Sequence, residues 1–258
     1  MTLRRVTIVC SFAIFLLYGV LILSLLYFFR GDTLLSALKS DRTLFSVKIS
    51  IFSATVSALL AMIIAIPSAF ALSRYEFPGK RAVDTMLELP MIVSPAALGA
   101  MLLIFFNNPA GLWIQEHGPQ FVFTFYGIVL AQFVTICGVS TRLIKAAMDE
   151  IPVRYEAVAR TLGASPERAF ITITLPLCKR GLYSAGILSW AKALGEFGAT
   201  ITIAGSMAMK TETLPIAIFM RLSSAEIEGT VILIMILVSI GLGILYVVRL
   251  LSRGSFFA

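Results

Sequence analysis

One uncharged segment near the start of the chain restricts the possible fold most strongly. Val6–Phe29 contains no Asp, Glu, Lys or Arg over 24 residues, and about 20 apolar residues suffice for a helix to cross the hydrocarbon core of a bilayer. The composition agrees, because 59% of the 258 residues are hydrophobic and 14% are charged. In a soluble domain roughly half of the residues are hydrophobic and roughly a quarter are charged. We therefore expect an integral membrane protein.

The same segment follows Arg4 and Arg5, as the apolar core of a signal peptide would. It is longer than such a core usually is, and no small-residue cleavage site precedes Arg30. We therefore expect this segment to be retained as the first membrane helix.

Six apolar segments are candidate membrane helices. Pro90 and Pro95 lie near the start of the third, and prolines are tolerated in membrane helices where neighbours satisfy the freed backbone carbonyl. No internal repeat or low-complexity linker divides the chain. The sequence therefore predicts an all-α membrane protein with one domain over residues 1–258. The helices are expected at about 6–29, 46–73, 88–106, 121–147, 181–204 and 229–251.

The basic residues are unevenly distributed between the connecting segments. If the N-terminus is inside, the inner segments hold fourteen Lys and Arg residues and the outer segments six, with Lys192 inside a helix. The predicted outer loop Asn107–Gln120 contains neither residue type. Because cytoplasmic loops are enriched in Lys and Arg, we predict that both termini are cytoplasmic.

The formal charge of +7 does not indicate a nucleic-acid partner, because the basic residues do not cluster with stacking aromatics. Cys10, Cys137 and Cys178 are scattered and form no disulfide or metal-binding pattern. His117 is the only histidine, so no histidine cluster exists. The sequence therefore predicts no metal site, and we interpret the cysteines as small apolar fillers.

Arg154–Pro176 is charged and helix-forming, unlike most of the chain. It has the pattern of two short helices joined by a bend. Gly163 suits the position just past a helix end, and Ser165 is a good N-cap before Pro166 at a first helical position. The second helix is expected to stop by Pro176.

On the first short helix, Tyr155, Val158, Ala159 and Leu162 share a face because they are three or four residues apart. An apolar stripe flanked by charges suits a groove on a soluble partner. It equally suits a surface helix that lies against its own bundle. The residues alone leave both interpretations open.

The spacing from Ala159 and Gly163 to "ITLP" at Ile173–Pro176 resembles the EAA loop of ABC importer permeases. The resemblance implies that residues of about 149–179 form a cytoplasmic coupling helix that docks into a separate ATP-binding subunit. Aligned on Gly163, Ala157 takes the place of the motif's glutamate, and Glu156 lies one residue early. The implied coupling residues are Tyr155, Glu156, Ala157, Val158, Ala159, Arg160, Leu162, Gly163, Ala164, Ser165 and Pro166.

Trp190–Phe219 contains "ALGEFGA", "AG" and "KTETLP", and is similar to the fifth span and following outer loop of molybdate, tungstate and sulfate permeases. With "LELPMIVSPAALG" at Leu87–Gly99, the likeness covers roughly residues 40–250. It implies a type I ABC importer permease in a prokaryotic plasma membrane. Molybdate or tungstate is the implied substrate, and sulfate, phosphate or thiosulfate is the alternative.

The resemblance also implies partners and further sites. The partners would be a second copy of the chain, two ATP-binding cassette subunits, an extracytoplasmic oxyanion-binding protein and membrane lipid. Lys192 and Glu196, four residues apart, can pair on one helix face, either facing the pathway or bracing the bundle. The implied pathway or gate residues are Pro95, Lys192, Glu196, Gly198 and Thr200, and the implied binding-protein contacts are Lys210, Thr211 and Thr213.

Gly205–Thr211 has the first Gly, the Lys and the Thr of a phosphate-binding loop. Met209 occupies the place of the required second Gly, and no strand precedes the segment. We therefore expect no ATPase site or cofactor in this chain, with ATP and Mg²⁺ bound by the partner subunit. An intramembrane protease is disfavoured because Ser206 lacks a partner base. Ion-coupled carriers and channels remain the rival class, although carriers usually place several ionisable groups within spans.

Cysteine labelling tests the predicted topology. The test uses intact cells that express a variant of the protein without its three native cysteines. An impermeant thiol reagent should label a cysteine introduced at position 115 and should not label one introduced at position 160. Labelling at 160 but not at 115 would show that the orientation is inverted.

Overall fold

The computed structural model describes residues 3–29 and 39–253, and within these ranges every regular element is a helix. Four of these helices are long and apolar enough to cross a membrane, and a fifth candidate span is a bent pair. The predicted all-helical membrane fold is confirmed. The four helices are α1 Leu3–Ser24 with its 3₁₀ continuation η1 Leu25–Phe28, α3 Asp41–Arg74, α8 Phe125–Asp149 and α15 Ile227–Arg253.

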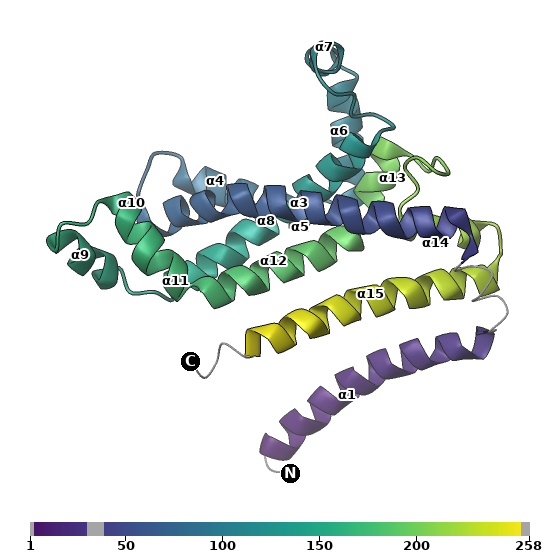
Figure 1. The fold of residues 1–258 in the computed structure, drawn as a ribbon, viewed down its shortest axis with the longest axis horizontal. Helices are drawn as coiled ribbons and strands as arrows, with labels where there is room; N and C mark the ends of the chain where they lie inside the picture. The colour runs from purple at the N-terminus through teal and green to yellow at the C-terminus, as the bar shows by residue number, and fades with distance from the viewer. Residues whose placement is uncertain (1–2, 30–38, 254–258) are drawn as a thin grey trace.

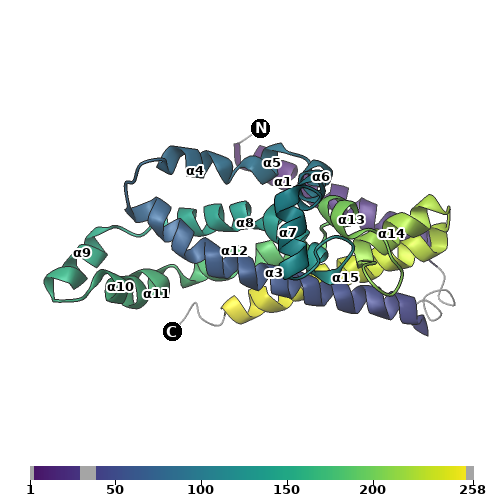
Figure 2. The ribbon, with the colours of Figure 1, turned by 90° about the horizontal axis from the view of Figure 1, so that it is seen from above.

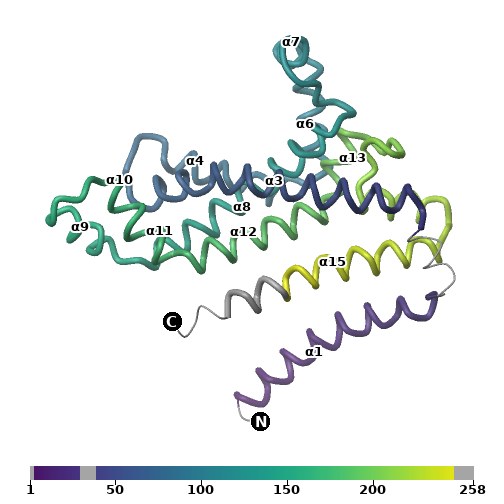
Figure 3. The backbone as a smooth tube through the Cα atoms, viewed as in Figure 1, coloured from purple at the N-terminus to yellow at the C-terminus, as the bar shows by residue number. Residues whose placement is uncertain are grey.

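The helices follow one long axis. α3, α8 and α12 (Lys179–Leu194) lie side by side, α15 runs along them, and α1 lies beyond α15 (Figure 1, Figure 2). None of the residues of α1 and η1 is buried. The start of α1 and the polar helix α9 (Arg154–Thr161) lie toward one end of the molecule in the backbone trace (Figure 3), and α15 runs toward the same end (Figure 1). This arrangement agrees with the prediction that both termini lie on the same side of the membrane. Which side is cytoplasmic stays a prediction.

Small side chains bring α3 and α8 close together. The buried face of α3 repeats Ser and Ala at intervals of three or four residues, from Ser50 to Ala69. Such residues let membrane helices approach closely and bond across the interface. The Ser57 hydroxyl oxygen lies 3.1 Å from the Val129 carbonyl oxygen and 3.0 Å from Gln132 Oε1. α3 and α8 therefore form the centre of the bundle.

The third predicted helix, 88–106, is wrong as one helix. Its residues lie in α5 (Leu89–Ile92) and α6 (Pro95–Phe106), and the span that includes them bends by 112°. Ser94, which precedes a proline and is therefore biased to extended backbone, has ψ 147° and accepts a hydrogen bond from the Ala97 N–H. The chain thus starts a new helix at Pro95, and α6 leaves the bundle axis (Figure 1). α4 (Lys80–Met86) precedes α5.

The fifth predicted helix, 181–204, is also interrupted. α12 ends at Leu194, and α13 (Gly198–Ala204) begins after a short break. α13 crosses α6 where two glycines remove side chains from the contact. A Cβ on Gly99 would lie 2.7 Å from the Ala199 carbonyl oxygen, and a Cβ on Gly198 would lie 2.9 Å from the Ala96 nitrogen.

Like α4, two further short helices lie outside the six predicted ones. α7 (Pro109–His117) follows α6, with Gly111 against the backbone of Phe105. α14 (Leu214–Ser223) precedes α15, and the Ser50 hydroxyl of α3 accepts a 2.7 Å hydrogen bond from the Leu214 N–H.

Substitution of Gly99 tests the close crossing of α6 and α13. Gly99→Ala should lower stability by about 1–3 kcal/mol, the usual cost of overpacking, because the added Cβ meets backbone atoms. The unfolding temperature of the purified protein in detergent measures this loss. Gly241→Ala is the matched control, because nothing lies within 4 Å of a Cβ there. Equal unfolding temperatures for the two variants would contradict the close crossing.

Candidate functional site

The polar segment forms the end of the molecule that projects beyond α3 and α8 (Figure 1). α9 carries an exposed apolar stripe, with relative exposures of 46% for Tyr155, 58% for Val158 and 83% for Leu162. None of the eight residues of α9 is buried. An apolar stripe left exposed beside charged residues is typical of a protein-interaction surface. Of the two interpretations left open by the sequence, the structure favours a stripe that faces outward.

The predicted bend after α9 is confirmed. Gly163 has φ +89°, in the left-handed region, and its N–H donates to the Arg160 carbonyl. The next N–H, of Ala164, reaches back to the Ala159 carbonyl at 3.0 Å, which is the pairing of a glycine-terminated helix. Ser165 then caps α10 (Pro166–Ala169) by accepting a hydrogen bond from the Arg168 N–H.

The second short helix does not stop by Pro176, contrary to the prediction. α10 continues as the π-helix η2 (Phe170–Thr174) and α11 (Leu175–Leu177), and α12 begins two residues later. Pro176 lacks the N–H of an α-helical turn, and the turn before it is widened, with the Leu175 N–H donating to the Phe170 carbonyl. The polar segment is therefore continuous with the helix that re-enters the bundle.

A largely buried ion pair joins α9 to the bundle. Arg74, the last residue of α3, donates from Nε to Glu156 Oε1 at 2.8 Å. Its Nη2 donates to the carbonyl oxygens of Met148 and Ile151, both at 3.0 Å. The Thr174 hydroxyl donates to the same Glu156 oxygen at 2.7 Å. The two charged side chains are only 5% and 12% exposed.

The sequence alone indicates for Arg74 only that it is one of the basic residues that set the orientation of the chain in the membrane. The displaced position of Glu156 relative to the motif is the one signal of this pairing. Successive residues are about 100° apart around a helix, so Glu156 lies on a different side of α9 from Tyr155, and there its side chain contacts Arg74 of the bundle. The structure thus gives Glu156 a partner inside its own chain.

The predicted pairing of Lys192 with Glu196 is wrong in this structure. Lys192 lies near the end of α12 and is exposed, whereas Glu196 is buried beyond the helix end. Because the helix stops at Leu194, the two side chains no longer share one helix face. Glu196 Oε1 instead accepts a 3.1 Å hydrogen bond from the Ala199 N–H at the start of α13.

The other three predicted pathway residues, Pro95, Gly198 and Thr200, lie in the first turns of α6 and α13. A Cβ on Gly198 would lie 3.1 Å from the Pro95 Cβ, so the starts of α13 and α6 touch. Thr200 of α13 is fully buried, and its hydroxyl has no hydrogen-bond partner. Whether these residues line a pathway stays a prediction.

A second charged cluster was not predicted. Arg142 of α8 forms an ion pair with Glu88 and lies 3.7 Å from Asp84 Oδ1. These carboxylates come from the bent span, so the cluster fastens α4 and α5 to α8. The sequence separates these residues by more than fifty positions, and no local pattern joins them.

The predicted binding-protein contacts are only partly accessible. Lys210 is exposed, but Thr211 and Thr213 are buried, and contact of these residues with a binding protein stays a prediction. The Thr211 hydroxyl accepts a hydrogen bond from the Met207 N–H. Glu212 is also buried and accepts two 2.7 Å hydrogen bonds from Arg42 of α3, which folds the loop inward.

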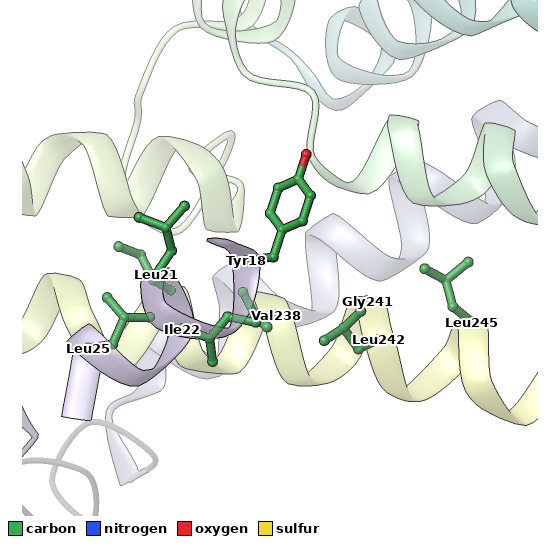
Figure 4. A pocket seen from close by; sticks show the side chains of 9 residues that line it. Tyr18, Leu21, Ile22, Leu25, Val238, Gly241, Leu242 and Leu245 are labelled. Atoms are coloured by element: carbon green, nitrogen blue, oxygen red, sulfur yellow. The ribbon is translucent and has the colours of Figure 1, made fainter. Parts of the chain in front are cut away.

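An apolar cavity of about 550 Å³ lies between α1 and α15 (Figure 4). Tyr18, Leu21 and Ile22 line it from α1, and Val238 and Leu242 line it from α15. No charged residue lines this cavity, so it does not have the chemistry of an anion site.

Comparisons with known proteins agree on one class of protein. The family described as "binding-protein-dependent transport system inner membrane component" matches residues 58–255. The molybdenum transport system permease protein of Haemophilus influenzae is 36% identical over 67% of this chain and 77% of its own length. The sulfate transport system permease protein of Escherichia coli K12 is 30% identical over 80% of this chain and 75% of its own.

A solved structure shares the fold. It is a bacterial alginate ABC transporter in complex with an alginate pentasaccharide-bound periplasmic protein. The structural match covers 99% of this chain and 94% of the transporter chain, with a TM-score of 0.80 and 15% sequence identity. At this identity the likeness concerns the fold alone.

Proposed function

The chain belongs to the family of inner membrane components of binding-protein-dependent transport systems, and from this premise we propose that it is the transmembrane subunit of an ATP-driven importer of molybdate or tungstate. The 36% identity to a molybdenum permease supports molybdate. Tungstate is a tetrahedral dianion of nearly the same size, so one path suits both.

The chain transmits motion rather than performing chemistry. In this proposal a separate subunit binds ATP and Mg²⁺, and α9 inserts its stripe of Tyr155, Val158 and Leu162 into a groove on that subunit. The exposure of this stripe at the end of the bundle is the observation that carries the coupling role. Helix-in-groove docking needs anchors spaced three or four residues apart, as these are.

The complete importer would contain more chains. We place a second copy of this chain beside the first, an ATP-binding subunit on each α9, and an oxyanion-binding protein at the outer mouth. The periplasmic protein in the alginate transporter complex supports the last partner by analogy of fold. Exposed Lys210 suits contact with that protein.

The start of α13 and the start of α6 are the proposed gate. Pro95 and Gly198 meet there, and buried Thr200 offers a hydroxyl without a partner. Hydroxyl groups bind an anion without the strong hold of a fixed cation, which would trap an oxyanion. Glu196 serves this region by capping α13.

Sulfate is the second candidate substrate, because the sulfate permease of Escherichia coli K12 is 30% identical over 80% of this chain. An ion-coupled carrier would belong to a different class and would not need ATP. Reconstitution separates these possibilities.

Transport in proteoliposomes tests the proposed function. The chain alone should hydrolyse no ATP, and the complex with its ATP-binding subunit and binding protein should take up molybdate only when ATP is supplied. Excess sulfate should compete poorly. Uptake driven by an ion gradient without ATP, or ATPase activity of the isolated chain, would contradict the assignment.

Replacement of Gly163 tests the coupling segment. Gly163→Val places a branched side chain in a left-handed backbone, which costs roughly 1 kcal/mol or more locally, and it should misdirect α9. We expect normal membrane insertion, weaker stimulation of the ATPase and a loss of molybdate uptake at least as large.

Gly79→Val is the matched control, because Gly79 also has a positive φ of 84° and open space around it but lies before α4. It should carry a similar local strain and retain coupled uptake. Wild-type uptake by Gly163→Val at equal expression would show that the bend is not part of the coupling element.

A further inference from the structure

The way in which α9 is attached to the bundle has a functional consequence. α9 contacts α10 and η2 but has no fully buried residue, so apolar packing contributes little to its position. Glu156, which is turned away from the exposed stripe, adds polar contacts to Arg74 of α3 and Thr174 of η2. Loss of these contacts should therefore loosen the angle between α9 and the bundle.

The Arg74 guanidinium joins several segments at once. Beyond Glu156, it binds the last turn of α8 through Met148 and the connection to α9 through Ile151. Its Nη1 also donates to the neighbouring Ser73 hydroxyl at 2.8 Å. A guanidinium presents five donors in a rigid fork, so it fixes direction as well as distance. A lysine ammonium is a single rotatable point charge and cannot reproduce that fork.

Glu156 receives a second bond from the other side of the coupling segment. The Thr174 hydroxyl is fully buried and donates to the oxygen that Arg74 also contacts. Thr174 belongs to η2, which leads through α11 into α12. One carboxylate oxygen therefore holds together the end of α3, the coupling helix and the segment that re-enters the bundle.

We propose that Arg74 and Glu156 are positioning residues that make α9 move as one body with the cytoplasmic ends of α3 and α8. The proposal rests on the proposed function, in which α9 docks on an ATP-binding subunit. Displacement of α9 by that subunit then reaches the bundle through the ion pair instead of being lost at the bend at Gly163. Glu156 is consequently engaged within its own chain and is not a contact to the ATPase.

The central test measures coupling rather than assembly. In proteoliposomes of the full complex, Glu156→Gln and Arg74→Lys should reduce the molybdate taken up per ATP hydrolysed by at least about threefold, the scale of a modest coupling between contacting residues. Co-purification with the ATP-binding subunit should persist, because the exposed stripe is untouched.

Glu76→Gln is the matched control. Glu76 forms a 2.8 Å ion pair with Lys80 between α3 and α4, but its side chain is 90% exposed, and exposed pairs contribute little. This variant should keep the wild-type ratio of uptake to hydrolysis. An unchanged ratio for both Glu156→Gln and Arg74→Lys would overturn the proposal.

A second measurement needs no ATPase and no transport. Spin labels at position 158 on α9 and at exposed position 146 on α8 should give a narrow distance distribution in a chain whose three native cysteines are replaced and whose sequence is otherwise wild-type. The distribution should broaden in the Glu156→Gln background and stay narrow with Glu76→Gln. A narrow distribution in all three backgrounds would show that the ion pair does not hold α9.

The two experiments keep the proposals separate. Failure of the wild-type complex to take up molybdate with ATP would contradict the proposed function, while the spin-label result would still decide whether the ion pair fixes α9. Coupled wild-type uptake with unaffected variants would contradict only the role of Arg74 and Glu156.

Discussion

Close contact between α3 and α8 is the constraint on which the rest of the structure depends. Neither helix gains from exclusion of water inside a bilayer, so association relies on tight packing and hydrogen bonds between helices. Small residues such as Ser53, Ala54 and Ala61 supply the packing, and the Ser57 hydroxyl supplies a hydrogen bond to α8, with the Val129 carbonyl and Gln132 Oε1 as its two nearby acceptors. Because α3 and α8 end together, their ends bring Arg74, Met148 and Ile151 into one place. That place is where α9 is attached.

The attachment of α9 solves two opposed requirements. The helix must expose its apolar stripe to bind a partner, and it must still transmit force to helices within the membrane. A polar anchor on the opposite face meets both needs, since the Glu156 side chain packs against Arg74 with only 12% of its surface exposed, while Val158 and Leu162 stay exposed. The left-handed glycine at the bend lets α10 begin in a new direction without strain.

Features set by neighbouring residues could be predicted from the sequence, and features set by distant contacts could not. The bend at Gly163 and the cap at Ser165 follow from local backbone chemistry. The break before α13 depends on Glu196 capping the Ala199 N–H and on the close approach of Gly99, and no pattern of hydropathy contains that information. Likewise, the sequence predicts that Thr211 is a surface contact, yet the folding of its loop buries it.

Photocrosslinking from α9 tests most directly whether this helix is the element that binds the ATP-binding subunit. A benzophenone amino acid in place of Val158 should form an adduct with that subunit in the intact complex, identified by mass. The same amino acid in place of Ile63, an exposed residue within the membrane helix α3, should form none. Absence of the Val158 adduct in a complex that still transports molybdate would contradict the docking of α9 on the ATP-binding subunit.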